Sequence, residues 1–528
     1  MIADPTSFRL NEIACGDCVE VMRGWPDAAV NCVVTSPPYW GLRSYAGEQE
    51  RVWGGDDGCE HEWADETLEA VTGTGGNWQQ AENGPGLATG KHQTRFRGDV
   101  NAAAVKERVT IRRGFCLRCG AWRGALGLEP TPSLYVEHII AIFREVRRVL
   151  HPRGTVFLNL GDSYAGSGGA HANEVNPGIS QSFRRFGGAG DTTGTDGYER
   201  SNRNGRGRGG PVADLKPKDL CMMPARVALA LQADGWWLRS EITWCKLSPM
   251  PESVTDRPTS ATEKVYLLTK GEDYWYDAEA VRQPHKRDWD PANNGGSIGN
   301  RGSTWHLDAR GHARGEHLEP ARKHPGGRNL WNYWVLGPEP MGWEMCRACQ
   351  RVYSPKQHGR LPTIAVNGAF HTACRCGRHD AWLSHFATFT PTLASRCLLA
   401  GCPPKVCATC GEPWARRVEA EGGSIGHGDW TDKSRAMEAG MSAGSGAKTK
   451  RGDGTYRRRD LGYFPACECG TEETRPGVAF DPFMGSGTVA LAALKLGRSF
   501  LGCEISEEYV ALAEARIAPA RAQTRLEM

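Results

Sequence analysis

The stretch "GVAFDPFMGSGTVALAALKLGRSFLGCEISEEYVALAEARI" (residues 477–517) alternates two kinds of local pattern. Two short apolar runs of strand length end at Asp481 and Glu504, and each is followed by a turn and a segment with helical periodicity. Repeated alternation of strand and helix predicts a mainly parallel sheet that helices cover on both faces. We therefore expect an α/β fold.

The turn between the first strand and its helix contains Gly485 and Gly487. Glycine lets the backbone approach a ligand closely, and the helix that follows offers unpaired amides. Glu504, at the tip of the next strand, is placed to accept hydrogen bonds from ribose hydroxyls. A glycine turn alone is about as often a plain tight turn as a ligand-binding turn. The carboxylate at the tip of the next strand favours a nucleoside site. No Gly-Lys-Ser/Thr sequence follows, which disfavours a nucleoside triphosphate.

The same alternation recurs earlier in the chain. Residues 9–40 read as strand, turn, helix and strand, and the second strand ends at Thr35. An apolar stripe from Val136 to Leu150 predicts a helix that Pro152 and Gly154 end, with a strand at residues 155–160. A helix and a strand are expected within residues 219–246, and another strand at residues 264–270.

Composition sets outer limits on the kind of protein. A chain of 528 residues favours two to four structural units, and a formal net charge of +3 neither requires nor excludes a nucleic-acid partner. Apolar runs stay below the length of about 20 residues that a membrane span needs. The first residues lack the basic and apolar regions of a signal peptide. We expect a cytoplasmic protein without a membrane partner.

A rigid, polar loop follows the strand that ends at Thr35. Pro37 and Pro38 fix φ and restrict the residues before them, so the loop is stiff. The Ser36 hydroxyl and the proline carbonyls are hydrogen-bond acceptors, and Tyr39 offers a flat ring. This arrangement suits a planar ring that carries an exocyclic amino group. The alternative is a structural proline turn with a packed tyrosine.

Taken together, five motifs resemble those of the β group of DNA amino-methyltransferases, which use S-adenosylmethionine. The motifs are "TSPPYW" (35–40), "DPFMGSGT" (481–488), "GCEIS" (502–506), "HFATFTPTLASRCLLAG" (385–401) and "GDC" (16–18), and their order is that of the β group. The resemblance implies a Rossmann-like methyltransferase sheet. It implies a catalytic loop of Ser36, Pro37, Pro38 and Tyr39. It also implies a cofactor site of Asp17, Cys18, Thr35, Thr388, Asp481, Phe483, Gly485, Ser486, Gly487, Thr488, Glu504 and Ile505.

The activity implied by the resemblance is direct methyl transfer from S-adenosylmethionine to the exocyclic amino group of a base flipped out of double-stranded DNA. Members with serine before the two prolines mostly act on the 4-amino group of cytosine, so Ser36 favours cytosine over the 6-amino group of adenine. Other possibilities are a methyltransferase acting on RNA or a protein amide, and an inactive zinc-bearing nucleic-acid-binding module. A partner restriction nuclease fits the resemblance, whereas the oligomeric state stays open.

Cysteines occur in closely spaced pairs. In a reducing compartment such pairs favour metal binding over disulfides, and CxxC turns typically supply two thiolates to tetrahedral zinc. We expect two or three structural zinc sites that fasten insertions, with reduced unpaired thiols as the alternative. The sets are Cys407, Cys410, Cys467 and Cys469; Cys346, Cys349, Cys374 and Cys376; and, less regular, Cys59, His61, Cys116 and Cys119.

These motifs divide the chain into segments. Residues 283–343 are rich in Arg, Lys, His and Trp and, with the middle cysteine set, are expected to recognise the target sequence; a solvated basic loop is the alternative. The expected segments are 1–58 (catalytic half of the core), 59–124 (zinc-binding insert), 125–282 (core with a mobile basic loop at 165–212), 283–383 (target recognition and zinc), 384–402 (cofactor-site helix), 403–475 (zinc-ribbon insert) and 476–528 (cofactor-binding half).

Overall fold

The computed structural model describes most of the regular segments of the chain. The described residues are 8–41, 50–64, 68–72, 107–111, 114–165, 215–216, 218–249, 251–283, 305–307, 313–315, 328–337, 343–366, 369–379, 382–384, 390–421 and 457–527. Thr388 and the expected basic loop, apart from its first residue Ala165, lie outside these residues.

An eight-stranded sheet forms the centre of the molecule, with the order β1-β23-β22-β2-β7-β9-β8-β12. Its strands are β1 (Glu12–Cys15), β2 (Val30–Thr35), β7 (Leu150–Leu160), β8 (Trp237–Lys246), β9 (Thr262–Thr269), β12 (Tyr333–Leu336), β22 (Val478–Asp481) and β23 (Ser499–Glu504). Neighbours pair in parallel except at β9, which is antiparallel to both β7 and β8. The mainly parallel sheet expected from the sequence is confirmed.

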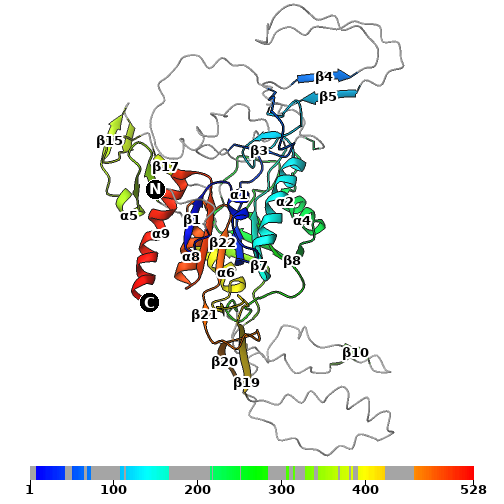
Figure 1. Ribbon diagram of the computed structural model, residues 1–528, viewed down its shortest axis with the longest axis vertical. Helices are drawn as coiled ribbons and strands as arrows, with labels where there is room; N and C mark the ends of the chain where they lie inside the picture. The colour runs from blue at the N-terminus through cyan, green and yellow to red at the C-terminus, as the bar shows by residue number, and fades with distance from the viewer. Residues whose placement is uncertain are drawn as a thin grey trace, which may run out of the picture.

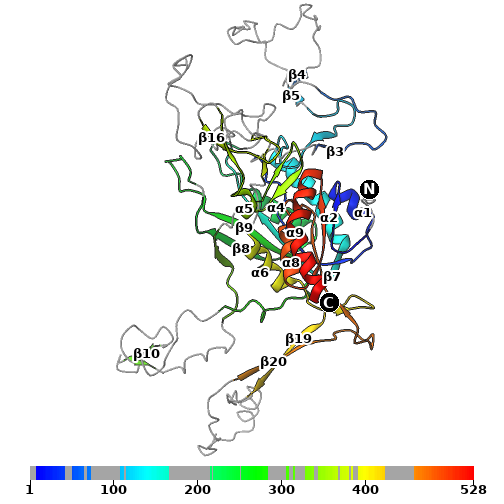
Figure 2. The same ribbon diagram turned by 90° about the vertical axis from the view of Figure 1, so that its left-hand side faces the viewer.

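Helices cover both faces of this sheet, as Figures 1 and 2 show. On one face α1 (Cys18–Arg23), α2 (Pro132–Val149) and α4 (Met223–Ala233) share a buried cluster with β-strand residues such as Val33 and Phe480. On the other face α6 (Pro391–Gly401), α8 (Thr488–Lys495) and α9 (Glu507–Glu527) pack against residues such as Val34 and Ala479. Adjacent residues of one strand therefore enter two different cores, which is why these strands read as continuous apolar runs.

Strand order changes direction between β22 and β2. The chain passes from β22 through α8 to β23 on one side, and from β2 through α2 to β7 on the other. In open α/β sheets, ligands bind outside the carboxyl ends of the strands at this kind of reversal. The strands that were expected to carry "DPFMGSGT" and "TSPPYW" are therefore neighbours, paired through Cys32–Ala479 and Val33–Phe480.

One expected boundary was wrong. The helix ends at Val149, and Leu150, expected at the end of the apolar helical stripe, already has extended backbone as the first residue of β7. Pro152 and Gly154 lie inside that strand instead of before it. The register between β2 and β7 is irregular between Val30 and Cys32, which accommodates the proline without loss of the sheet.

Small strands and one short helix belong to the insertions. They are β3 (Arg51–Trp53), β4 (Leu68–Thr72), β5 (Glu107–Ile111), β6 (Trp122–Gly124), β10 (Trp305–Leu307), β11 (Ala313–Gly315), β13 (Glu344–Cys346), β14 (Arg351–Tyr353), α5 (Pro355–His358), β15 (Thr363–Val366), β16 (Ala369–Thr372), β17 (Trp382–Ser384), β18 (Val406–Cys407), β19 (Ala415–Glu421), β20 (Arg457–Phe464) and β21 (Thr474–Arg475). In Figures 1 and 2, β3 lies near one end of the molecule, and β19 and β20 lie at the other.

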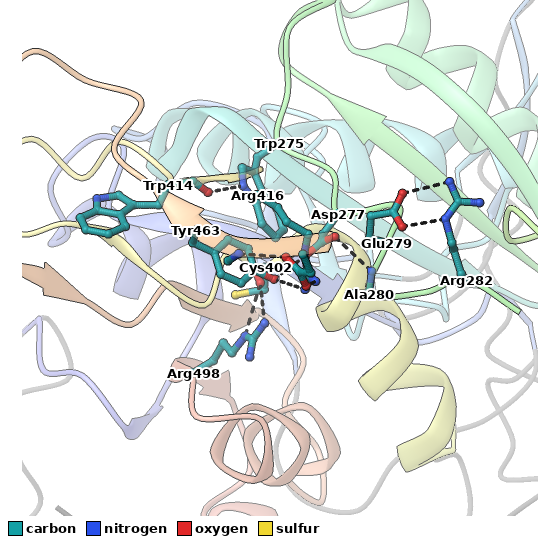
Figure 3. A network of polar contacts seen from close by, with 12 residues as sticks. Trp275, Asp277, Glu279, Ala280, Arg282, Cys402, Trp414, Arg416, Tyr463 and Arg498 are labelled. Carbon is teal, nitrogen blue, oxygen red and sulfur yellow. Dashed lines mark hydrogen bonds and ion pairs between the residues drawn. The ribbon is translucent and has the colours of Figure 1, made fainter. Parts of the chain in front are cut away.

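The insertion that contains β19 and β20 is fastened at the amino edge of the sheet, as Figure 3 shows. The Asp277 carboxylate, almost fully buried, accepts hydrogen bonds from Arg416 Nε (3.0 Å) and from the Tyr463 hydroxyl. The Trp275 indole donates to the Trp414 carbonyl at 3.0 Å. These contacts lie far along the strands from the tips of β2 and β22. No helix in the described part of the chain is long and apolar enough to cross a membrane.

Candidate functional site

Two loops meet at the carboxyl tips of β2 and β22. The Thr35 hydroxyl donates a hydrogen bond of 2.7 Å to Asp481 Oδ1, and both residues are fully buried. The same carboxylate oxygen accepts from the Phe483 amide at 3.0 Å, which turns the chain away from β22. The first residues of the proline loop and of the glycine turn are thereby held together.

Positive φ values shape the glycine turn. Gly485 has φ +52° and Gly487 has φ +78°, in the region that L side chains rarely adopt. Gly487 is also the N-cap of α8, and a Cβ there would lie 3.1 Å from the Ala513 side chain. The turn therefore depends on glycine both for its conformation and for its packing against α9.

The Glu504 carboxylate spans the gap between the glycine turn and the start of α9. It accepts hydrogen bonds from the amides of Gly485 (2.8 Å) and Ser506 (3.0 Å). Burial raises the pKa of Glu504, although both amides favour its charged form. Each carboxylate oxygen keeps a further lone pair, so Glu504 can still accept a hydrogen bond from a ligand.

A single cavity lies between the two loops. Most of the residues predicted for the cofactor line it, together with two from the proline loop: Asp17, Cys18, Ser36, Pro38, Asp481, Phe483, Gly485, Ser486, Thr488, Glu504 and Ile505. Thr35, Pro37, Tyr39 and Gly487 stand directly next to lining residues but do not line the cavity themselves. Segments from both ends of the chain thus share one space, as the motif combination requires.

Asp17 is already bonded within the protein. As the N-cap of α1 it accepts from the amides of Val19 (3.0 Å) and Glu20 (3.1 Å), and its other oxygen pairs with Arg51. Arg51 lies over the Trp53 ring, 4.0 Å from its centroid. The cavity wall above Asp17 is therefore formed by two residues of strand β3.

The Tyr39 hydroxyl is the centre of a polar cluster. It lies 3.1 Å from Ser36 Oγ, 3.0 Å from Asn159 Oδ1 and 2.8 Å from Glu263 Oε2, and Lys246 pairs with the other oxygen of Glu263. The ring itself packs on Gly161, where a Cβ would lie 2.6 Å from a ring carbon. The hydroxyl contacts and the packing on Gly161 together fix the orientation of the Tyr39 ring.

The proline loop is held from outside by the segment that follows β6. The Tyr135 hydroxyl donates to the Pro38 carbonyl at 2.9 Å, and the buried Trp40 donates through its indole N–H to the Glu129 carbonyl at 2.8 Å. The Gly41 amide donates to the Gly127 carbonyl at 2.8 Å. Trp40 is part of the buried core.

Sequence reasoning missed several residues of this site. Tyr509 of α9, Leu126 and the two β3 residues Arg51 and Trp53 line the cavity. Arg516, nearly buried, donates to the Ser486 carbonyl (2.9 Å), Ser486 Oγ (3.1 Å) and Thr488 Oγ1 (2.9 Å). An arginine within an otherwise apolar helical stripe is the one signal that could have indicated Arg516. Nothing local distinguishes Arg51, because its position depends on the pairing of β3 with β6.

The three cysteine sets each form a compact cluster. In each, the four ligand atoms lie within 4.8 Å of one another. Tetrahedral zinc with Zn–S bonds near 2.3 Å places its sulfur atoms about 3.8 Å apart. Cys59 and Cys116 lie 3.9 Å apart, Cys346 and Cys376 3.6 Å, and Cys349 and Cys374 3.5 Å. The distances and the thiolate and imidazole donors fit zinc.

In each cluster the pKa of one cysteine, Cys116, Cys374 or Cys407, is lowered, whereas that of a neighbouring cysteine, Cys59, Cys346 or Cys469, is raised. The backbone N–H of Cys410 lowers the pKa of Cys407 to about 6. Since zinc binds the thiolate and not the thiol, this N–H prepares the sulfur for a metal. The four cysteines of the middle set form a full cluster without the nearby His371 and His379.

Comparison with known proteins identifies relatives. The profile of the DNA methylase family N6/N4 matches residues 30–406 and 470–515. The Type II methyltransferase M.XycI of Xanthomonas campestris pv. cyanopsidis is 30% identical over 58% of this chain and 67% of its own length. M.Cfr9I of Citrobacter freundii is 29% identical over 56% of this chain and 63% of its own length. The match therefore spans about two thirds of the length of these relatives.

Solved structures give a weaker likeness. The PvuII DNA methyltransferase, described as cytosine-N4-specific, superposes with a TM-score of 0.36 at 11% identity, over 97% of this chain and 91% of that chain. A TM-score of this size adds nothing to the family match.

Arg516 is expected to be essential for the shape of the glycine turn. In Arg516→Met the Ser486 carbonyl and the Thr488 hydroxyl lose a charged donor in a buried place, and we expect the free energy of unfolding to fall by about 3 kcal/mol. Chemical denaturation measures this. Arg521→Met is the control on the same helix, because Arg521 is more exposed than Arg516 and its pair with Glu514 and its bond to the Asn11 carbonyl contribute about 1 kcal/mol or less each. Equal losses in the two variants would contradict the role of Arg516.

Proposed function

Because the chain belongs to the N6/N4 family of DNA methylases, as its motifs predicted, we propose that it transfers a methyl group from S-adenosylmethionine to an exocyclic amino group in double-stranded DNA. The observation that carries this proposal is the shared cavity. Ser36 and Pro38 of the proline loop line the same space as Gly485 and Glu504 of the glycine turn. A methyl donor and an acceptor base can therefore meet there.

The residues around the cavity fit S-adenosylmethionine. Buried carboxylates at Glu504 and Asp481 suit ribose hydroxyls and positive charge, and the apolar side chains of Phe483 and Ile505 suit an adenine ring. When bound, S-adenosylmethionine supplies an electrophilic methyl group on a sulfonium. We assign its binding to the predicted cofactor residues that line the cavity, with Arg51 and Trp53 added.

The proline loop positions the acceptor nitrogen. The lone pair of an exocyclic amino group is delocalised into the base, so the nitrogen is a weak nucleophile. Ser36 Oγ and the Pro37 carbonyl would accept its two hydrogens and favour a pyramidal nitrogen with an available lone pair. Positioning and fixed dipoles then supply the rate enhancement, without a covalent enzyme intermediate.

The methylated nitrogen must finally lose a proton. The polar cluster around Tyr39 offers a path for it, from Ser36 Oγ through the phenol to the Glu263 carboxylate, with contacts of 3.1 and 2.8 Å. Lys246 pairs with the other oxygen of Glu263 and fixes the position of this carboxylate. The same bonds hold the tyrosine ring beside the proline loop, where we propose that it stacks on a flipped base.

Cytosine is the favoured target. Serine, and not aspartate or asparagine, precedes the two prolines, and this choice mostly accompanies action on the 4-amino group. Adenine remains the second candidate, because both ring types carry an amino group of similar geometry. The relatives are described as Type II methyltransferases, which supports a partner restriction nuclease for this chain and a cytoplasmic location with the DNA.

Zinc is proposed for all three cysteine clusters, in a structural role. Each cluster has four ligands and so leaves no position open for substrate. We propose the segment boundaries as the sequence analysis gives them, with the first and third clusters in the inserts at 59–124 and 403–475. We propose that the middle cluster supports the target-recognition region at 283–383.

The function is tested by methylating defined DNA. Purified protein with isotope-labelled S-adenosylmethionine should label duplex DNA, and mass spectrometry of the digested DNA should show 4-methylcytosine. Labelled 6-methyladenine would favour the second candidate. Label in RNA or protein instead of DNA would overturn the proposal.

Tyr39 should be needed for transfer but not for cofactor binding. In Tyr39→Ala we expect the rate of methyl transfer to fall by about 100-fold or more, because the base loses its stacking surface and the amino group its alignment. The dissociation constant of S-adenosylmethionine, measured by calorimetry, should stay within about threefold. Tyr39→Phe keeps the ring and isolates the hydroxyl contribution. A parallel loss of cofactor binding in Tyr39→Ala would contradict the assignment.

Cofactor affinity should depend on pH through Asp481. Burial raises the pKa of Asp481 to about 7, so much of this carboxyl is protonated near neutrality. A cationic ligand favours the charged carboxylate, so its binding releases a proton from Asp481. The affinity for S-adenosylmethionine therefore rises with pH up to about 7, by at most about tenfold per pH unit, and then levels off. Calorimetry between pH 5.5 and 8.5 measures this. Asp481→Asn should flatten the profile, and an unchanged slope in that variant would contradict the prediction.

A further inference from the structure

Strand β3 forms a wall of the cavity but has little structure of its own to hold it. It consists of three residues that pair with the three residues of β6 through Arg51–Gly124, Val52–Arg123 and Trp53–Trp122. A two-stranded ribbon of this length is not stable by itself in water. Something beyond the ladder must therefore fix it.

The cluster of Cys59, His61, Cys116 and Cys119 closes the ribbon at its outer end. Cys59 and His61 follow β3, whereas Cys116 and Cys119 precede β6. Backbone bonds tie the cluster to the ribbon, because the Cys116 amide donates to the Ala121 carbonyl at 2.7 Å and the Arg123 amide to the Gly114 carbonyl at 2.8 Å. Gly55 has no room for a Cβ, which would lie 2.8 Å from Cys119 Sγ.

At its inner end the ribbon contacts both halves of the proposed active site. Arg51 pairs with Asp17, and Trp53 stacks on His138 of α2 with ring centroids 4.2 Å apart. Gly127, just after β6, touches the proline loop, where an added Cβ would lie 3.3 Å from Pro38 Cβ. A displacement of the ribbon would open the cofactor wall and loosen the catalytic loop together.

We infer that a soft divalent cation such as Zn²⁺, bound by Cys59, His61, Cys116 and Cys119, controls cofactor binding by holding the β3–β6 ribbon against the cavity. Binding of the metal joins two segments far apart in the chain, and its binding energy adds to the packing of Trp53 and Trp122 in the main core. Arg51 and Trp53 act as cofactor-binding residues whose position depends on the metal. This inference rests on the proposed function, because it requires S-adenosylmethionine in the cavity.

The cluster of Cys407, Cys410, Cys467 and Cys469 provides an internal control. Its insertion is fastened at the amino edge of the sheet through Asp277, Trp275 and their partners (Figure 3). None of its ligands lines the cofactor cavity. Loss of metal there should leave the cavity wall in place.

The experiment compares zinc content, by elemental analysis, with S-adenosylmethionine affinity, by calorimetry, in the full-length protein. His61→Ala should lose one zinc per chain and weaken cofactor binding by tenfold or more. His61→Cys restores a four-ligand set and should keep both the zinc and the affinity. Cys410→Ser should also lose one zinc but bind the cofactor within about twofold of the wild type.

The outcomes distinguish a failure of the metal inference from a failure of the proposed function. Normal cofactor affinity in a zinc-depleted His61→Ala protein, or an equal loss in Cys410→Ser, would overturn the inference and leave the proposed function standing. Wild-type protein that binds no S-adenosylmethionine would overturn the proposed function itself. Should His61→Ala prove insoluble, Arg51→Ala keeps all metal ligands. It should retain every zinc and still weaken the cofactor by tenfold, and unchanged affinity in this variant would overturn the inference.

Discussion

The hydrogen bond from the Thr35 hydroxyl to the Asp481 carboxylate, 2.7 Å long, joins residues 446 positions apart in the chain. It is buried, so its loss would leave two polar groups without water. It ties the tip of β2 to the tip of β22 at the point where the strand order reverses. Every other feature of the site, from the tyrosine cluster to the glycine turn, is placed relative to these two tips.

Strand patterns were predictable because they are local. Buried parallel strands produce apolar runs, and the turn after β22 needs glycine for its positive φ, so both are visible in the sequence. The helix–strand boundary at Leu150 was not, since an apolar residue suits either element. Sheet pairing sets the end of the helix at this point, because Leu150 in extended conformation pairs its backbone with β2.

The predicted site residues came from motifs, and the ones missed have no motif. The apolar stripe of α9 marks Arg516 as unusual, but its role is visible only once α9 lies beside α8, where its guanidinium reaches the carbonyl and hydroxyl of Ser486. Glu263 lies at the start of the antiparallel strand β9, and only the pairing of β9 with β7 brings it to Tyr39. Such contacts depend on the long-range arrangement of strands, which local periodicity does not encode.

The three cysteine clusters have similar ligands but hold different parts of the molecule. The part that each cluster holds determines whether its metal affects the cofactor cavity. The first cluster fixes a ribbon that carries Arg51 and Trp53, and the middle one packs through Met345 on Tyr509, another residue of the cavity wall. Arg347, within the CxxC turn of the middle cluster, also pairs with Glu508 at 2.8 Å. The β3–β6 ribbon therefore forms part of the cavity wall, and the middle insertion packs behind that wall on Tyr509. A ligand bound between such walls depends on whatever keeps them folded, and for short ribbons the strongest available constraint is a metal.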